Sequence, residues 1–343
     1  MKAYHMILCG ALLLLSLVSC EARELRFSKD GDFRILQLTD LHLQSQNPQE
    51  TDKVFARMDS LVRWEQPDLI TVTGDLLYSS PAAGLLRSVV AKLDSFGKPW
   101  VVVWGNHDHE HDLSRQELAA IIMEGKHTLN TLNPEGELAD IDVAIMDGKK
   151  QAYHLYFMDS HAYSPNPEYP GYAWFTEAQV NWVRQRPKGP ALAFFHIPLC
   201  EYIEACLPGC DPHPGKRDNS LCWGNIGESV ACSRYNSGMF DAMLEAGNVT
   251  GVFCGHDHDN DFIAAYKGIA LAYGKFSGTD CEYNDLPRGG RVIVLNRGNR
   301  YFETWLREDS GRYIRRCRFD GQKIILPKWK EGYQLYGTIT PFD

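Results

Sequence analysis

Short apolar runs that end abruptly in polar residues recur along the chain. One of them, PWVVVW over 99–104, stops at Gly105 and is followed at once by Asn106, His107 and Asp108. Consecutive β-branched and aromatic residues without alternation are typical of a strand buried on both faces. Gly-Asn also suits an ordinary turn. Because the same ending occurs in four other places, we favour an open α/β sheet that presents chemistry at the carboxyl ends of its strands.

Strand-like runs alternate with helical periodicity over most of the chain. Apolar positions at helical spacing predict helices over 54–62 and 85–96, and Ser114 with Glu117 predicts a capping box. Thr176 and Gln179 predict a second cap, and Gly247 a helix end. Strands are predicted at 33–39, 69–73, 153–158, 191–195, 249–254, 291–295 and 301–306, besides the run described above.

The first twenty residues have the pattern of an export signal. A lysine precedes an apolar run over 6–18, which is too short to cross a bilayer as a helix. The ending Leu-Val-Ser-Cys resembles a bacterial lipobox. The resemblance implies a signal peptide over 1–19, a lipid on Cys20 and a tether over 20–31; the alternative is an ordinary signal peptide with a chance cysteine. We therefore expect an exported protein, lipid-anchored to the bacterial cell envelope on the periplasmic or cell-surface side of the outer membrane.

The rest of the chain fits one large domain. Roughly 320 residues suit an α/β domain over 32–306 with a C-terminal extension over 307–343. A formal net charge of −9 gives no basic surface for nucleic acid, so none is expected as a partner. The membrane is expected as a partner only through the lipid, and the sequence does not assign an oligomeric state.

Cysteines concentrate in one stretch rich in Pro, Gly and Asn. Five lie within 200–232, at spacings that match no common zinc pattern. In an exported protein they predict a loop stapled by disulfide bonds, whose pairing cannot be deduced. Cys254 lies inside an apolar run and is expected to be a buried free thiol. Because this loop separates His196 from His256, we expect it to cover the mouth of a site and to influence substrate choice.

Ligand-type side chains follow the strand-like runs. Carboxylate oxygen, amide oxygen and imidazole nitrogen suit divalent or trivalent first-row metals. The spacings Asp-x-His and His-x-His place two ligands on one side of an extended segment, because side chains alternate with period two. A single histidine at a strand end is more often a hydrogen-bonded neutral residue, but five such endings favour a metal site. The residues concerned are Asp40, His42, Asp75, Asn106, His107, His196, His256 and His258.

In this order the endings resemble the five-part signature of calcineurin-like metallophosphoesterases. The resemblance covers about 32–306, and PALAFFHIPLCEY, NSGMF and GHDHDNDF are similar to phosphatases related to the purple acid phosphatases. It implies an α/β fold, a four-layer α/β/β/α sandwich. It also implies two metal ions, Mn, Fe or Zn, of which one is bound by Asp40, His42, Asp75 and His258. Asp75 bridges to the second, which Asn106, His196 and His256 complete.

One position departs from the purple enzymes. Gly74-Asp75-Leu-Leu-Tyr78 matches their pattern, in which the tyrosine is an iron ligand, but those enzymes lack a histidine equivalent to His42. One metal rarely needs both side chains. We therefore interpret Tyr78 as a residue that packs beside the ligands.

The resemblance implies hydrolysis of a small-molecule phosphate monoester by in-line attack of a metal-bridging hydroxide. Asn106 and His107 are expected to contact the phosphate, with His107 as the general acid. Asp108 either orients His107 or begins a helix. His161 and Lys275, which closely follow strand ends, are further candidate substrate contacts. A phosphodiesterase or nucleotidase is the alternative within the class, and a binding lipoprotein with a degenerate metal site is the alternative outside it.

Overall fold

The computed structural model describes residues 24–207, 220–280, 283–327 and 332–333. The predicted signal peptide and Cys20 lie outside these residues. The helices are α1 (Pro48–Glu65), α2 (Ala82–Ser95), α3 (Arg115–Ile122), α4 (Glu177–Arg184), α5 (Glu201–Cys206) and α6 (Met239–Ala246).

Within the described residues, sixteen strands form two mixed sheets. The first has the order β1-β5-β6-β7-β9-β11-β10-β8, and the second has the order β15-β14-β13-β12-β2-β3-β4, with β16 beside β14. The strands are β1 (Leu25–Arg26), β2 (Asp32–Leu38), β3 (Leu69–Thr73), β4 (Trp100–Val103), β5 (Ile141–Asp147), β6 (Lys150–Phe157), β7 (Ala191–Phe194), β8 (Cys222–Trp223), β9 (Val249–Cys254), β10 (Ile263–Tyr266), β11 (Ile269–Tyr273), β12 (Gly289–Asn296), β13 (Phe302–Glu308), β14 (Arg312–Phe319), β15 (Ile324–Ile325) and β16 (Gly332–Tyr333).

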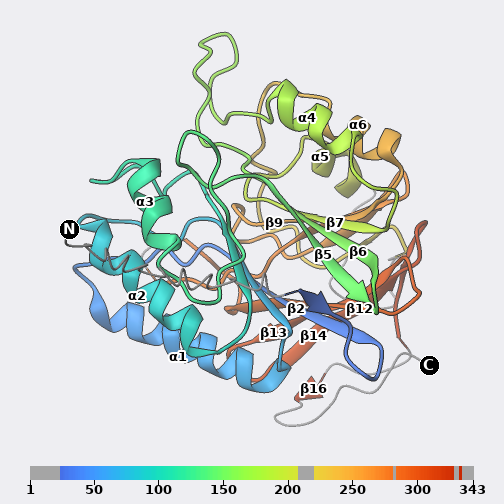
Figure 1. Cartoon of the computed structure of the whole chain (residues 1–343), viewed down its shortest axis with the longest axis horizontal. Coiled ribbons are helices and arrows are strands. Elements are labelled where there is room, and N and C mark those ends of the chain that lie inside the picture. The colour runs from blue at the N-terminus through green and yellow to red at the C-terminus, as the bar shows by residue number, and fades with distance from the viewer. Residues whose placement is uncertain (1–23, 208–219, 281–282, 328–331, 334–343) are drawn as a thin grey trace, which may run out of the picture.

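Three apolar layers show that the two sheets are stacked between helices. One cluster joins the β2-containing sheet to α1, α2 and α3, and another joins the β9-containing sheet to α4, α5 and α6. The third cluster lies between the sheets and contains Phe33, Phe194 and Phe253. Figure 1 shows α1 and α2 outside one sheet and α4 to α6 outside the other. The predicted four-layer α/β/β/α sandwich is confirmed.

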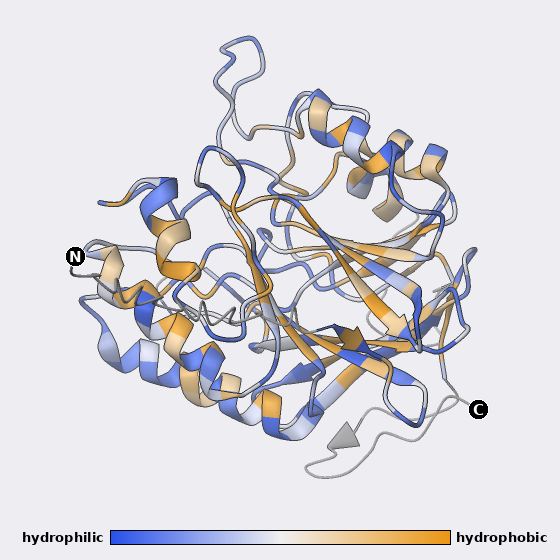
Figure 2. Ribbon diagram, in the orientation of Figure 1, coloured by the Kyte–Doolittle hydropathy of each residue, from blue (hydrophilic) through white to orange (hydrophobic). Residues whose placement is uncertain are grey.

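The alternation of side chains explains why the inner strands read as unbroken apolar runs. In β2, Phe33 and Ile35 face the other sheet, whereas Leu36 and Leu38 face the helices. Both faces are therefore buried, as expected of parallel strands covered on two sides. Apolar residues accordingly colour the central strands in Figure 2.

Most predicted elements are present close to their predicted bounds. Both capping boxes form, Ser114 with Glu117 before α3 and Thr176 with Gln179 before α4. The pattern missed β5, β10, β11 and β14. Strand β14 lies within the segment that we expected to be a C-terminal extension, and it pairs antiparallel with β13, so the sheet continues beyond 306.

The predicted disulfide-rich loop is not confirmed. Cys200, Cys206 and Cys232 are free thiols in the structure, while Cys222 is disulfide-bonded. Cys200 and Cys232 interact through their side chains but are not bonded to each other. Cys210 lies outside the described residues. Cys254 is a buried free thiol, as predicted.

No helix within residues 24–207, 220–280, 283–327 and 332–333 is both long enough and apolar enough to span a membrane.

Candidate metal centre

Five neighbouring strands bring the ligand-type residues to one edge of the sandwich. Strands β2, β3 and β4 are parallel neighbours, and Asp40, Asp75 and Asn106 follow them. In the facing sheet β7 and β9 are also parallel neighbours, and His196 and His256 follow those. Because parallel strands end at the same edge, segments more than 200 residues apart meet there.

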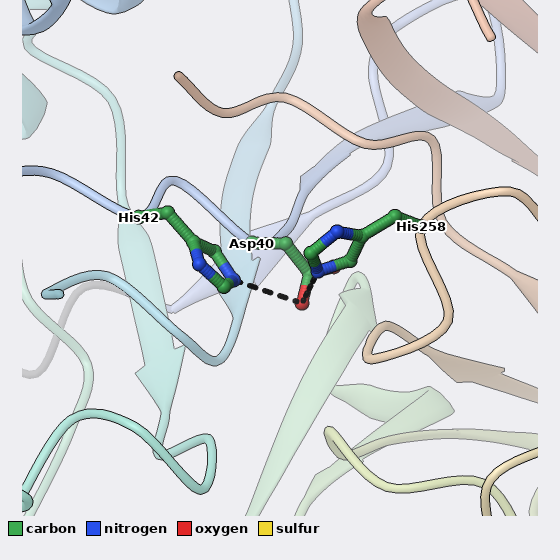
Figure 3. Close-up of side chains that lie close together, drawn as sticks. All are labelled: Asp40, His42 and His258. Carbon is green, nitrogen blue, oxygen red and sulfur yellow. Dashed lines mark ion pairs between the residues drawn. The ribbon is translucent and has the colours of Figure 1, made fainter. Parts of the chain in front are cut away.

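The first group of ligand-type side chains consists of Asp40, His42 and His258. Their ligand atoms lie within 4.8 Å of one another, and all three residues are buried. The Asp40 Oδ1 atom lies 4.0 Å from His42 Nε2 and 3.9 Å from His258 Nε2. Figure 3 shows both imidazoles directed toward this carboxylate. Separations of this size leave room for one cation between the three groups.

The second group consists of Asp75, His196 and His256, again within 4.8 Å and buried. Asp75 Oδ2 lies 3.1 Å from His196 Nε2 and 3.5 Å from His42 Nε2 of the first group. The Asn106 Oδ1 atom lies 3.2 Å from His196 Nε2. One carboxylate oxygen of Asp75 therefore faces both groups.

The backbone around the ligands is held in uncommon conformations. Asp40, His42, Asp75 and His256 all have positive φ, between 48° and 79°. Non-glycine residues rarely adopt this region, and such residues cluster at functional sites. A β-carbon on Gly105 would lie 2.0 Å from Asp75 Oδ1, which explains the glycine before Asn106. The ligand turns are thus packed too closely for larger residues.

Hydrogen bonds to backbone carbonyls set the tautomers of two histidines. The Nδ1 atom of His196 donates to the carbonyl oxygen of Thr73 over 2.8 Å, and that of His258 donates to the carbonyl oxygen of Tyr283 over 2.8 Å. In the neutral ring, which is the form that binds a metal, each Nε2 atom is thereby left with its lone pair toward the cluster. The buried Nε2 of His256 has no hydrogen-bond partner among the described residues. This donor set fits two first-row cations.

Electrostatics within the cluster also favour cations. Burial tends to raise the pKa of the Asp75 carboxyl, but His196 and His42 hold that pKa well below its usual range. Burial tends to lower the pKa of His196, but Asp75 raises it to about 10. Burial and the neighbouring His196 hold the pKa of His256 well below its usual range. The cluster therefore contains an ionised Asp75 carboxylate, whose countercharge without a metal is the His196 imidazolium.

Asp108 does not orient His107, nor does it begin a helix. Its buried carboxylate accepts backbone N–H bonds from Asp75, Leu76, Leu77 and Gly105, over 2.7 to 3.1 Å. Those bonds fix the turn that carries Asp75 against the one that carries Asn106. Asp108 is thus a positioning residue for the ligand turns, and both readings of it from the sequence are wrong.

Glu110 contacts His107 instead. Its Oε2 atom lies 2.6 Å from His107 Nδ1, and its Oε1 atom accepts a hydrogen bond of 2.6 Å from the Tyr163 hydroxyl. That hydroxyl accepts a bond of 3.1 Å from Asn106 Nδ2. The sequence analysis missed Glu110 and Tyr163. For Glu110 the spacing of three residues from His107, across a turn, was an available signal.

Two predicted substrate contacts have other partners. Lys275 is buried, and its Nζ atom is paired with Asp261 over 3.0 Å. The Nε2 atom of His161 is bonded to Gln179 Oε1 over 2.9 Å. Neither residue lines the cavity at the cluster, so both predictions are wrong in this structure. The Tyr78 ring lies beside the ligands, with its centroid 5.1 Å from that of His42 and 4.9 Å from that of His107, and its role as a packing residue stays a prediction.

A cavity of about 100 Å³ opens at the cluster. The described residues that line it are His42, Asp75, His107, Tyr172, Ala231, His256, Asp257, His258 and Tyr283. Ala231 belongs to the segment that we expected over the mouth, and its backbone N–H donates to Asp257. That segment therefore reaches the cavity at its C-terminal end.

Comparisons with known proteins agree with this geometry. Residues 33–260 match the family described as calcineurin-like phosphoesterase. A protein of Arabidopsis thaliana named probable inactive purple acid phosphatase 29 is 32% identical, over 84% of this chain and 82% of the relative. Phosphatase DCR2 of Saccharomyces cerevisiae is 30% identical, over 84% of this chain and 56% of the relative. The crystal structure of a dimetal phosphatase from Danio rerio has the same fold, with a TM-score of 0.54 and 13% identity over 82% of this chain and 97% of that one.

Proposed function

The chain belongs to the calcineurin-like phosphoesterase family, and from this premise we propose that it is a metal-dependent hydrolase of phosphate monoesters. One observation carries the proposal: two buried groups of ligand-type side chains share the Asp75 carboxylate at the floor of an open cavity. The name of the Arabidopsis thaliana relative describes that protein as probably inactive. In this chain, every predicted ligand side chain lies in or against the two groups.

Asp40, His42, Asp75 and His258 would hold one cation. Asp75 would also hold the second, together with Asn106, His196 and His256. Two such cations, Mn, Fe or Zn, supply an activated water and neutralise charge on the phosphate in an in-line displacement. The chain therefore needs no serine or cysteine nucleophile.

His107 supplies the proton for the leaving group. It lines the cavity, and the Glu110 carboxylate beside its Nδ1 atom holds the ring in place. The Nε2–H is then available to the oxygen that departs. Asn106 is held by Tyr163 through its Nδ2 atom, which directs its Oδ1 atom toward His196. These contacts prepare the site before a substrate binds.

The test is an assay on protein purified without chelator, with metal content measured on the same sample. Nitrophenyl phosphate and bis(nitrophenyl) phosphate are offered after supplementation with Mn, Fe or Zn. We expect the monoester to be hydrolysed faster. Faster hydrolysis of the diester would support the phosphodiesterase alternative. Two bound metals without hydrolysis of either ester would support a binding protein.

We also propose that the protein is exported and lipid-anchored to the bacterial cell envelope through Cys20. The apolar run over 6–18 and the Leu-Val-Ser-Cys ending support this proposal. Thiol acylation requires the sulfur, so Cys20→Ser is expected to abolish lipid labelling and to yield an unanchored or unprocessed protein. Lipid labelling that persists in Cys20→Ser would refute the proposal.

A further inference from the structure

The cavity at the ligand cluster is small for a complete substrate. Its volume of about 100 Å³ is below the roughly 300 Å³ and more of sites that enclose a whole small molecule. The proposed function places the phosphoryl group at the ligands. The rest of the substrate then lies at the rim, so the residues of the rim meet the leaving group.

Two tyrosines, Tyr172 and Tyr283, line this cavity, and we call their rings the tyrosine rim. The ring of Tyr172 stands edge-on to the imidazole of His256, with centroids 4.4 Å apart. The ring of Tyr283 stacks on His258 at 4.6 Å and 22°. Each tyrosine therefore contacts a histidine of a different ligand group, and both tyrosines line the same cavity.

Contacts outside the cavity hold the rings in place. The Tyr283 hydroxyl donates to Glu228 over 2.8 Å. Tyr172 stacks on Tyr163, with centroids 6.0 Å apart, and the two residues pair across an isolated antiparallel bridge. Tyr163 is itself held by Glu110. Fixed aromatic surfaces bind flat apolar groups with little loss of conformational freedom.

The rim offers no cationic side chain to an anionic leaving group. None of the described lining residues is a lysine or an arginine. Glu228 places a carboxylate at the Tyr283 hydroxyl. An anionic leaving group, such as a second phosphate, would face this carboxylate without a cationic side chain among the described lining residues.

We infer that the substrate is a phosphate monoester of an uncharged aromatic alcohol, whose ring lies against Tyr172 and Tyr283. This inference rests on the proposed function for the hydrolysis itself. The aromatic preference is a property of the rim and can be measured by binding alone.

The test uses two probes that differ only in aromaticity. Benzylphosphonate and cyclohexylmethylphosphonate resist hydrolysis, and their Kd values for the metal-loaded protein are measured by calorimetry. Benzyl phosphate and cyclohexylmethyl phosphate, whose leaving groups are both alkoxides, are compared in kcat/KM. An aromatic pair contributes a factor of about 2 to 12, so we expect about a tenfold preference for the benzyl compound in both measurements.

Matched variants assign the preference to the rim. Tyr172→Leu and Tyr283→Leu should each reduce the preference to about threefold or less, whereas Tyr172→Phe and Tyr283→Phe should retain it. Tyr169→Leu is the control, because Tyr169 packs against Trp174 and Tyr235 away from the cavity lining. A further probe, 4-carboxybenzyl phosphate, should react about two- to fivefold more slowly than benzyl phosphate.

The outcomes separate the inference from the proposed function. Equal binding of the two phosphonates, failure of both to bind, or a preference that survives both leucine variants would overturn the inference. If 4-carboxybenzyl phosphate reacts faster than benzyl phosphate, the inference that the leaving group is uncharged would be overturned. Discrimination in binding without hydrolysis of any ester would overturn the proposed function and leave the inference supported.

Discussion

The ligand cluster and the tyrosine rim differ in how the chain builds them. The cluster lies at the ends of adjacent parallel strands, and Asp40, Asp75 and His196 are at most 1% exposed. The rim is carried by loops, and its residue Tyr283 is 53% exposed. Sheet packing therefore fixes the cluster, whereas a few side-chain hydrogen bonds hold the rim.

This difference predicts two kinds of mutational effect. Changes in the cluster should lower metal binding and the turnover of every ester. Changes in the rim should alter the ratio between esters while metal content stays constant. A rim variant that also loses metal would show that the cluster and the rim are one structural unit. A cluster variant that changes the ratio between esters would show the same.

The largest effect is expected for Asp75→Ala. Its Oδ2 atom faces His42 and His196 of both groups, so its loss leaves two cations with no shared carboxylate. Metal content should fall toward zero per chain, and kcat/KM should fall by about 10³-fold or more for all esters, because metals supply several kcal/mol of charge stabilisation. Metal analysis and assays on the same preparation test this.

Asp241→Ala is the control for Asp75→Ala, because Asp241 is exposed on α6. It should leave both quantities unchanged. Two metals and normal turnover in Asp75→Ala would contradict the ligand scheme.

His107→Asn should have the next largest effect, and only for some esters. General acid catalysis typically contributes about 10²–10⁴ in rate, and it matters when the leaving group is poor. An alkyl phosphate should therefore lose about 10²-fold or more in kcat/KM, whereas nitrophenyl phosphate should lose far less. Metal content should stay near the wild-type value.

Equal losses of kcat/KM on the two esters would assign His107 to phosphate binding. Loss of metal would assign it to ligand support. Glu110→Gln should reproduce the selective loss in weaker form, because Glu110 contacts His107 Nδ1.

The ligand cluster could be predicted from the sequence because its geometry follows from strand periodicity. Asp-x-His and His-x-His place side chains on one side, and neighbouring parallel strands bring their ends together. The roles of Asp108 and Lys275 were predicted wrongly because a position close to a strand end along the chain does not determine where the side chain points. The carboxylate of Asp108 turns back to four backbone N–H groups, and the side chain of Lys275 enters the interior to reach Asp261.

The rim depends on contacts that no local pattern contains. Tyr163 reaches Glu110 across 53 positions, and Tyr283 reaches Glu228 across 55. Strand β14 was missed for a related reason. Its arginines predicted an irregular basic tail. In the structure Arg316 pairs with Glu303 of the neighbouring strand, and this ion pair offsets the free-energy cost of burying the charge.

A smaller effect is expected in the pH dependence of metal binding. Without metal, Asp75 raises the pKa of His196 to about 10, against the opposing effect of burial, so this imidazole is protonated at neutral pH. A metal requires its neutral form, and binding must release that proton. Affinity should therefore rise about tenfold per pH unit from pH 6.5 to 8.5.

Competition with a chelator of known affinity measures that slope. Calorimetry in buffers of different ionisation enthalpy measures the proton released, which should be about one per chain. An affinity that does not change with pH would show that His196 is neutral before the metal binds.

The smallest effect is expected for Tyr78→Phe, which tests whether Tyr78 belongs to the cluster or only packs beside it. In the purple enzymes a tyrosinate bound to iron gives the colour, but here His42 supplies a nitrogen to the first group, and the Tyr78 ring packs against His42 and His107. The protein loaded with ferric iron should therefore be colourless. Loss of the hydroxyl should change kcat/KM by about threefold or less, since the ring contacts, worth about 0.5–1.5 kcal/mol per pair, are retained. The measurement is the visible spectrum of both proteins after iron loading, with metal content determined in parallel. A purple wild type that bleaches in Tyr78→Phe would make Tyr78 an iron ligand and would move it from the surroundings of the cluster into the cluster itself.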